Sequence, residues 1–242
     1  MIVAQLSDIH ANGSGERLDR LDKVLSWLRP MRPDAVIVSG DLAEEAHDRS
    51  YRAVKERLES LDCPYFVVPG NVDDHSDMRQ AFGDRFGWTS NRPLNVVGEV
   101  GGLRLIGLDV TVEGAHHGDA GPLLDWLGAE LAVSELPTLI FQHQHPFPSG
   151  VDGKDRNICR NGEGLAAVIE AAGNKVVALT CGHVHRPLFT RFAGRQATMA
   201  PSVTKANRLR LDGRESEIVD PPGLLLHHFA GGNLVSHVVM VD

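Results

Sequence analysis

The chain has 242 residues, 42% of them hydrophobic, which is enough for one large α/β domain or two small ones with a sizeable core. The 24 Lys and Arg against 32 Asp and Glu give a net charge of −8, which argues against a protein that binds nucleic acid mainly through phosphates. Three cysteines without a Cys-x-x-Cys pair argue against a disulfide framework and favour a reducing cytoplasm. No apolar run reaches the length of a membrane span, and no secretory signal fits before the first expected strand at Ile2.

Apolar runs that predict buried strands alternate with helical patterns through about residue 182. The expected strands are Ile2–Leu6, Ala35–Val38, Tyr65–Val68, Thr138–Phe141 and Val176–Thr180. Apolar residues from Leu18 to Leu28, spaced three and four apart, predict a first helix that ends before Pro30. Further helices are expected over Asp48–Leu61, Ser76–Phe86, Leu123–Ala132 and from Glu163 to Gly173, the last of them capped by Asn161.

Beyond His185 the pattern changes to short strands joined by Gly or Pro turns. These strands are expected at Leu188–Phe192, Gln196–Ala200, Leu224–Phe229 and Leu234–Val241. An alternating first part closed by hairpins favours two packed sheets with helices outside, formed by the whole chain, 1–242, as one domain. Within it, residues 201–223 are expected to form a hairpin or an oligomerisation segment, and the basic stretch Lys205–Arg214 is more typical of a solvated hairpin than of a binding patch.

Seven side chains of the metal-ligand type lie at loop-like breaks, most of them directly after an expected strand. They are Asp8, His10, Asp41, Asn71, His143, His183 and His185. Sites in α/β sheets are built at strand ends, so five such ends that carry only carboxylate, imidazole and amide groups predict a site for two metal ions. These ligand types suit Mn, Fe, Zn or Co, and Asp41, which follows a glycine in a tight turn, is the natural bridge between the ions.

Two ions in one site predict a particular chemistry. They lower the pKa of a bound water and clamp the attacking and leaving oxygens of a displacement at phosphorus. The expected reaction is therefore hydrolysis of a phosphate ester by attack of a metal-bridging hydroxide, with the ions stabilising the charge that develops on the phosphoryl oxygens.

The order Asp-x-His, Gly-Asp, Gly-Asn, His and Gly-His-x-His, from Ile2 to His185, resembles the calcineurin-like metallophosphoesterase superfamily. Further motifs resemble the bacterial class III cyclic-nucleotide and glycerophosphodiester phosphodiesterases and extend the likeness nearly to the C-terminus. They include Leu108-Asp109, His117-Gly118, Asp125-Trp126-Leu127, Ala200-Pro201-Ser202 and Pro221-Pro222-Gly223.

The resemblance implies a four-layer α/β/β/α sandwich of two mixed β-sheets flanked by helices. It also implies that Asp8, His10 and His185 hold one ion, that Asn71, His143 and His183 hold the other, and that Asp41 bridges them. His143 is preferred to His145 because the family carries a His-His-Pro-Pro-like element whose first histidine is the ligand. The implied protein is a cytoplasmic homo-oligomer (a dimer or larger), not bound to a membrane, that hydrolyses a small organic phosphodiester of the cyclic-nucleotide or glycerophosphodiester type.

The sequence departs from the family at the third motif, where Gly70-Asn71-Val72-Asp73 has Val72 in place of a histidine. The family uses that histidine to contact the phosphate and assist the leaving group, and a valine can do neither. Two hypotheses follow. Either His75, His117 or His145 substitutes, with His75 and His117 the candidate catalytic residues beside Asp41 and Asn71, or the metals act alone and activated aryl leaving groups are favoured. Asp73 and Asp74 are expected to cap or orient the helix start, with Asp73 also supporting a ligand.

Three alternative functions remain at this stage. A phosphomonoesterase is the closest in chemistry. A non-catalytic metal-binding scaffold is the second, because some relatives that lack the third-motif histidine are protein-binding platforms. A nuclease is the third, made less favourable by the net charge of −8.

Overall fold

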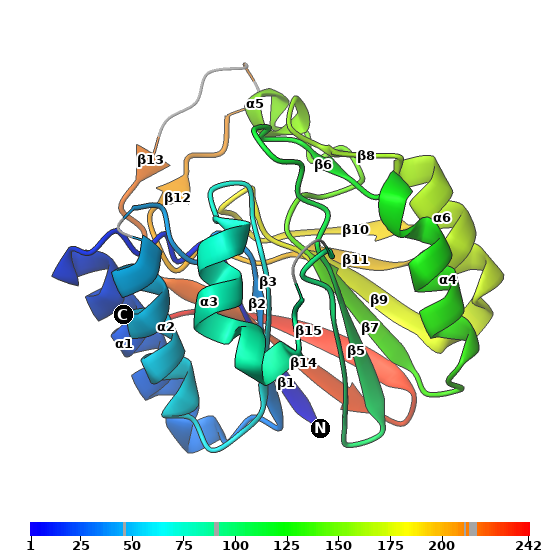
Figure 1. Ribbon diagram of the computed structural model, residues 1–242, viewed down its shortest axis with the longest axis horizontal. Helices are drawn as coiled ribbons and strands as arrows, with labels where there is room; N and C mark the ends of the chain where they lie inside the picture. The colour runs from blue at the N-terminus through cyan, green and yellow to red at the C-terminus, as the bar shows by residue number, and fades with distance from the viewer. Residues whose placement is uncertain (46, 90–91, 211, 213–216) are drawn as a thin grey trace.

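Two mixed β-sheets form the centre of the computed structural model, which describes residues 1–45, 47–89, 92–210, 212 and 217–242 (Figure 1). The first sheet has the order β15 (Asn233–Met240), β14 (Gly223–Ala230), β1 (Ile2–Leu6), β2 (Ala35–Ser39) and β3 (Tyr65–Val68). The second has the order β10 (Leu188–Phe192), β11 (Arg195–Met199), β9 (Val176–Cys181), β7 (Thr138–Gln142), β5 (Leu103–Leu108) and β4 (Val96–Val100). Strands β1, β2 and β3 run parallel to one another, as do β5, β7 and β9, so each set ends at a single edge of its sheet.

Helices cover the outer face of each sheet. On the first sheet these are α1 (Gly15–Leu28), α2 (His47–Glu59) and α3 (His75–Phe86), and on the second they are α4 (Leu124–Ala132) and α6 (Gly162–Ala171) (Figure 1). The expected α/β/β/α sandwich is confirmed. Shorter elements complete the chain: the helical turns Arg29–Met31, Gly121–Leu123 and Gly173–Lys175, helix α5 (Asp152–Asp155), and the pairs β6 (Gly118–Asp119) with β8 (Cys159–Arg160) and β12 (Ala206–Asn207) with β13 (Glu217–Ile218).

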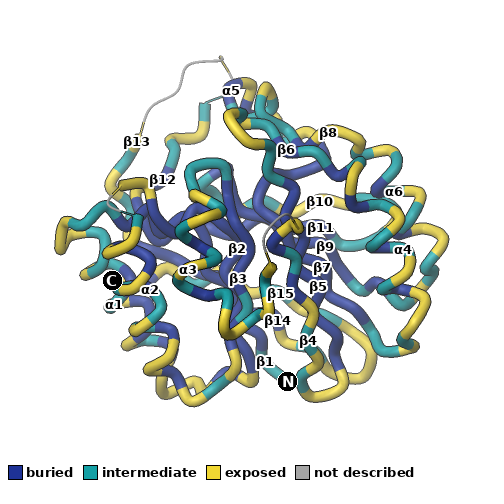
Figure 2. Tube along the Cα trace, in the orientation of Figure 1, coloured by how far each residue is buried: buried dark blue, intermediate teal, exposed yellow. Residues whose placement is uncertain are grey.

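Among the described residues, three apolar clusters fill the spaces between the four layers, because successive strand residues face opposite sides of a sheet. Val36 and Val38 of β2 pack toward α1 and α2, whereas Ile37 between them joins Leu105 and Phe141 in the cluster that separates the two sheets. A third cluster lies between the second sheet and helices α4 and α6. The central strands are accordingly buried on both faces, while exposed residues gather on the outward sides of the helices (Figure 2).

Two features differ from the sequence expectations. The antiparallel pair β4–β5, joined at Gly101-Gly102, was not anticipated, because exposed positions interrupt the short run in β4, and Arg104 and Gly107 interrupt the apolar run in β5. Asn161 does precede α6, but its side chain does not cap the helix. Its backbone has a φ of 58°, and its amide donates instead to Asp119 Oδ1 at 2.6 Å.

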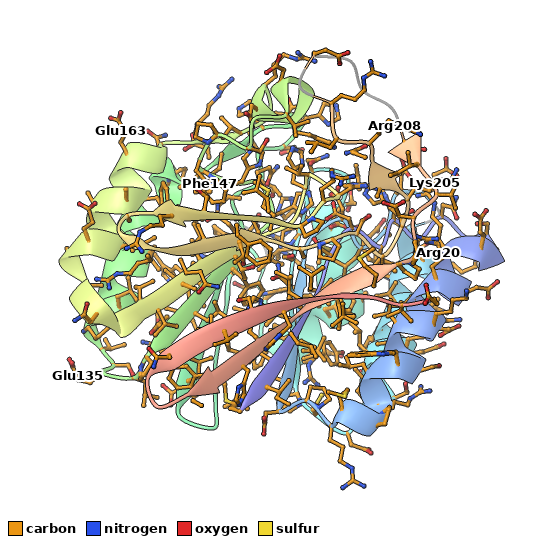
Figure 3. All side chains as sticks on the ribbon, turned by 180° about the vertical axis from the view of Figure 1, so that it is seen from behind. Arg20, Glu135, Phe147, Glu163, Lys205 and Arg208 are labelled. Atoms are coloured by element: carbon orange, nitrogen blue, oxygen red, sulfur yellow. The ribbon has the colours of Figure 1, made fainter. Side chains whose placement is uncertain are left out.

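Val203, Thr204 and Asp220, from the segment between β11 and β14, lie against α1. Arg20 of that helix donates to the carbonyl oxygens of Val203 at 2.7 Å, Thr204 at 2.9 Å and Asp220 at 2.7 Å, and Figure 3 shows Lys205 and Arg208 on the same side of the molecule as Arg20. Antiparallel pairing of β12 with β13 closes the described part of this segment. Positions 211 and 213–216, which include part of the basic stretch Lys205–Arg214, lie outside the described residues.

Among the helices that the structure describes, none combines the length and the apolar character that a membrane crossing requires.

Candidate metal centre

The side chains singled out from the sequence converge at the carboxyl ends of parallel strands from both sheets. Asp8, Asp41 and Asn71 follow β1, β2 and β3 of the first sheet. His143 follows β7 of the second sheet, and the His183–His185 element follows β9. Because the two sheets pack face to face, the ends of these five strands meet across the sandwich.

Five of these seven residues have a left-handed backbone, which is uncommon for residues other than glycine. Their φ angles lie between 51° and 73° at Asp8, His10, Asp41, His183 and His185. Each such conformation costs on the order of 1–3 kcal/mol and persists only where the surroundings enforce it. Two loops enforce it here by bonding to each other, since Asp8 N donates to Gly40 O at 3.1 Å and His10 N donates to Asp41 O at 2.9 Å.

Glycines precede three of the ligand candidates because side chains come too close for a Cβ. A Cβ on Gly40 would lie 2.5 Å from His143 Nδ1, and one on Gly70 would lie 2.2 Å from Asp41 Oδ1. At Gly182 it would lie 2.0 Å from Ser7 Oγ and 3.0 Å from Asp8 Oδ2. The glycines of the Gly-Asp, Gly-Asn and Gly-His motifs therefore allow the strand ends to close on one another.

One group of candidate ligand atoms comes from Asp8, His10, Asp41 and His185, and these atoms all lie within 4.8 Å of one another. His185 Nε2 is 3.1 Å from Asp8 Oδ1, and His10 Nε2 is 3.3 Å from Asp41 Oδ2 and 3.2 Å from His185 Nε2. The set has the composition and spacing of a divalent-cation site with nitrogen and oxygen ligands.

A second group lies on the other side of Asp41. His143 Nε2 is 3.2 Å from Asp41 Oδ2, and the rings of His143 and His183 are 5.1 Å apart between centroids. The His145 ring lies 5.8 Å from that of His183, but its Nε2 is engaged by Asp155 Oδ1 at 2.9 Å. Asp41 thus lies between the two groups, as a bridging carboxylate would.

Several buried polar atoms here make no hydrogen bond of acceptable geometry within the described residues, although Asp8 Oδ1 and His143 Nε2 lie near a charged neighbour, and they are the atoms that metal ions would engage. They are Asp8 Oδ1, Asn71 Oδ1, His143 Nε2 and His183 Nε2. An unpartnered buried polar atom costs about 1–3 kcal/mol. Four such atoms aimed into one space, from carboxylate, amide and imidazole groups, fit a pair of divalent ions.

Backbone carbonyls fix the tautomers of two of the histidines. His143 Nδ1 lies 2.7 Å from Ser39 O, and His185 Nδ1 lies 2.9 Å from Lys205 O. A carbonyl only accepts hydrogen bonds, so each Nδ1 must carry the proton. This leaves the lone pair of each Nε2 free for a metal ion, the arrangement usual for metal-bound histidines.

Without metal ions, the charges of the carboxylates and imidazoles balance one another. Burial opposes the charged form of His10, but its contacts with Asp8, Glu44 and Asp41 raise its pKa to about 10. Burial opposes the charged form of His143 as well, and Asp41 raises its pKa to about 9. The burial cost of the Asp41 carboxylate is outweighed by His143 and His10, which lower its pKa.

Metal binding should consequently release protons, because a metal needs neutral imidazoles where the metal-free site holds protonated ones. At pH 7, below both raised histidine pKa values, His10 and His143 are protonated in the metal-free protein. We expect Mn²⁺ affinity to rise between pH 6 and pH 8, and the apparent binding enthalpy to vary with the ionisation enthalpy of the buffer. A calorimetric titration without buffer dependence would contradict this expectation.

Asp73 supports the site from behind. Its carboxylate accepts hydrogen bonds from the backbone N–H groups of Leu42 (3.0 Å), Ala43 (3.0 Å) and Gly70 (2.8 Å), and from Tyr51 Oη (3.0 Å). One side chain therefore ties the loop after Asp41 to the loop before Asn71. Burial and the nearby Asp41 carboxylate raise the pKa of Asp73 to about 6. Its neighbour Asp74 caps α3 by accepting from Asp77 N at 2.8 Å, as expected from the sequence.

Asp73→Ala should destabilise the fold by at least about 2 kcal/mol, because several buried donors lose their acceptor. It should also weaken Mn²⁺ binding about 10- to 100-fold through the displaced loops. Urea unfolding and calorimetry would measure the two effects. Asp74→Ala is the matched control, with a cost of about 1 kcal/mol for the lost cap and unchanged metal affinity. Equal behaviour of the two variants would contradict this role of Asp73.

Two cavities meet at Asn71. The smaller, of about 390 Å³, opens over the metal-ligand candidates and is also lined by Val72, Lys154, Asn207 and Glu217. The larger, of about 780 Å³, extends from Asn71 past His75 and Asp109 toward Arg79 and Arg92. His117 is half-buried in the chain before β6 and is not among the residues lining either cavity.

His75 lies in the larger cavity, oriented by a buried carboxylate. Its Nε2 is 2.9 Å from Asp109 Oδ2 and 3.0 Å from Thr111 Oγ1. Asp109 is itself held by Leu94 N at 2.8 Å. The hydrogen bond with Asp109 raises the pKa of His75, although burial opposes this. An imidazole with a raised pKa beside Asn71 is suited to donate a proton.

Sequence reasoning assigned no role to Asp109 or Lys154. A role for Asp109 could have been predicted from the sequence, because Asp109 follows the apolar run of β5 just as the ligand candidates follow their strands. A role for Lys154 could not, since only the folded chain places α5 beside His183.

Comparisons with known proteins agree with this geometry. Residues 1–187 match the family model described as Calcineurin-like phosphoesterase. A probable glycerophosphodiester phosphodiesterase, GpdQ, from Arcobacter nitrofigilis is 31% identical over 244 residues, covering 95% of this chain and 89% of that protein. The 3',5'-cyclic adenosine monophosphate phosphodiesterase CpdA from Escherichia coli K12 is 30% identical over 219 residues, covering 89% and 78% of the two chains. Purple acid phosphatase PPD1 from yellow lupin shares the fold, with a TM-score of 0.63, 13% identity, and coverage of 99% of this chain and 51% of that one.

Proposed function

Because this chain belongs to the calcineurin-like phosphoesterase family, we propose that it is a metal-dependent phosphodiesterase that hydrolyses small organic phosphodiesters of the glycerophosphodiester or cyclic-nucleotide type. The observation that carries the proposal is the group of unpartnered buried atoms from Asp8, Asn71, His143 and His183 around Asp41. The relatives named for diester hydrolysis support the choice of substrate.

In the proposed site, Asp8, His10 and His185 would hold one ion, Asn71, His143 and His183 would hold the other, and Asp41 would be shared by the two. Two bound ions would lower the pKa of an attacking water and stabilise charge on the phosphoryl oxygens. The chain's own contribution is to hold the ligands rigidly through the Ser39, Lys205 and Asp73 contacts. The metals proposed are Mn, Fe, Zn or Co, the ions that such nitrogen and oxygen ligands suit.

We assign the proton donor for the leaving group to His75. Val72 occupies the position of the family's third-motif histidine and cannot donate. His75 lines the cavity that meets Asn71, and Asp109 favours its protonated form. The role of His117 as a neighbour of the substrate at the mouth of the site stays a prediction. Because such a contact serves binding and not the chemical step, we expect His117→Ala to raise KM without changing kcat.

The pH profile tests the His75 assignment. Asp109→Asn replaces the charged acceptor that raises the pKa of His75 with a neutral amide, so that pKa should fall toward its ordinary value. A proton donor must be protonated, so activity is lost as pH rises through its pKa, and the basic limb of kcat/KM should move to lower pH in Asp109→Asn. An unmoved basic limb would contradict the assignment.

The function itself is tested by comparing bis(p-nitrophenyl) phosphate with p-nitrophenyl phosphate on protein loaded with Mn²⁺. Faster hydrolysis of the diester supports the proposal, and a preference for the monoester favours a phosphomonoesterase. If metal binds but neither compound is hydrolysed, the protein is a metal-binding scaffold. A salt-sensitive affinity for single-stranded DNA would favour a nuclease.

We further propose that the whole chain, 1–242, acts as one domain in the cytoplasm, away from membranes, and forms a dimer or larger homo-oligomer through residues 201–223. Sedimentation of the intact chain tests the assembly. A monomer at micromolar concentration would contradict it.

A further inference from the structure

Lys154 is a cation at the metal site that the proposed mechanism does not use. It lines the smaller cavity together with His183, Asn71 and Val72. Within the described residues it is the only lysine or arginine on that lining, and its ammonium makes no ion pair there.

The turn that carries Lys154 is held in place by its neighbour. Asp155 accepts hydrogen bonds from His145 Nε2 at 2.9 Å, Ser149 N at 2.8 Å and Gly150 N at 3.0 Å. His145 is fully buried two residues after His143, so this contact ties α5 to the loop that carries a candidate ligand. Lys154 is therefore presented to the cavity by an anchored turn.

We propose that Lys154 binds a non-bridging oxygen of the substrate phosphate, on the side of the site formed by Asn71 and His183. This inference rests on the proposed phosphodiesterase function and deepens it. A phosphodiester carries one negative charge, and a lysine ammonium is a compact point charge that binds phosphate without requiring a fixed planar geometry.

The position also accounts for Val72. Val72 lines the same cavity and offers the phosphate neither a hydrogen bond nor a charge. The ammonium of Lys154, in α5, supplies that contact within the same cavity. The contact to the phosphoryl oxygen and the proton for the leaving group are then divided between Lys154 and His75, which lie in adjoining cavities.

The test compares wild-type protein with Lys154→Met, Lys154→Arg and Lys23→Met, all loaded with Mn²⁺. Lys23 is exposed on α1, so its variant makes the same change in net charge away from the cavity. Three quantities are measured: the Kd of inorganic phosphate by calorimetry, kcat/KM for bis(p-nitrophenyl) phosphate, and bound metal per chain. Loss of one charged hydrogen bond predicts that Lys154→Met weakens phosphate binding about 10- to 100-fold and lowers kcat/KM by a similar factor. Lys154→Arg should retain most of both, Lys23→Met should match wild type, and bound metal should not change.

Three results would overturn the inference. They are wild-type phosphate affinity in Lys154→Met, a loss in Lys154→Arg as large as that in Lys154→Met, and a fall in bound metal that accounts for the lost affinity. The same measurements distinguish failure of the Lys154 inference from failure of the proposed phosphodiesterase function. If wild type hydrolyses no diester but phosphate binding still depends on Lys154, the inference stands and the proposed function fails. If diesters are hydrolysed equally well without Lys154, the reverse holds.

Discussion

Asp41→Asn should lower diester hydrolysis by at least about 10³-fold and reduce bound metal below the wild-type level. The carboxylate of Asp41 has one oxygen 3.3 Å from His10 Nε2 and 3.2 Å from His143 Nε2, so it faces both ligand groups. An amide keeps the shape of the side chain but removes the charge that holds two cations side by side. Electrostatic stabilisation of the transition state is commonly the largest catalytic term, and a single neutral hydrogen-bond donor already contributes about 10²–10³-fold.

Asp19→Asn is the matched control for this prediction, because Asp19 is exposed on α1, away from the strand ends. Metal content after gel filtration and kcat for bis(p-nitrophenyl) phosphate would be measured on both variants. Wild-type metal content and activity in Asp41→Asn would contradict the bridging role of Asp41.

His75→Asn should affect alkyl phosphodiesters much more than aryl ones. An alkyl leaving group is a strong base and needs a proton, so its hydrolysis should slow by about 10²–10⁴-fold, the usual contribution of general acid catalysis. An aryl leaving group needs little such help, and its hydrolysis should slow by less than about tenfold. Adding Val72→His in the His75→Asn background should recover part of the alkyl activity, because the new imidazole would stand at the family's third-motif position.

Rates for matched aryl and alkyl diesters measure this effect, and His228→Asn, an exposed histidine of β14, serves as the control. Equal losses for the two substrate types would instead favour the hypothesis that the metals act alone. In that case wild-type protein should itself cleave aryl diesters far better than alkyl ones.

Much of the architecture could be predicted from the sequence because the central strands are buried on both faces. Runs such as those in β1, β2 and β9 are almost continuously apolar and end abruptly at polar residues. The order of these ends along the chain, with glycines beside them, was enough to propose the seven ligand candidates. The close approaches at Gly40 and Gly70 give the physical reason for that pattern.

What could not be predicted depends on contacts between distant segments. The carboxylate that orients His75 comes from Asp109, 34 positions along the chain. The cation near His183 comes from Lys154 in a four-residue helix with no sequence signature. The sequence shows that Val72 replaces the family's histidine, but it does not show which residues take over that role. Only the folded chain shows which side chains line the two cavities that meet at Asn71.

Anomalous diffraction from crystals of the Mn²⁺-loaded protein would locate the bound metal ions. We expect two anomalous peaks per chain, both in contact with Asp41. One should lie among Asp8, His10 and His185, and the other among Asn71, His143 and His183. A single peak, or peaks away from these seven side chains, would contradict this expectation.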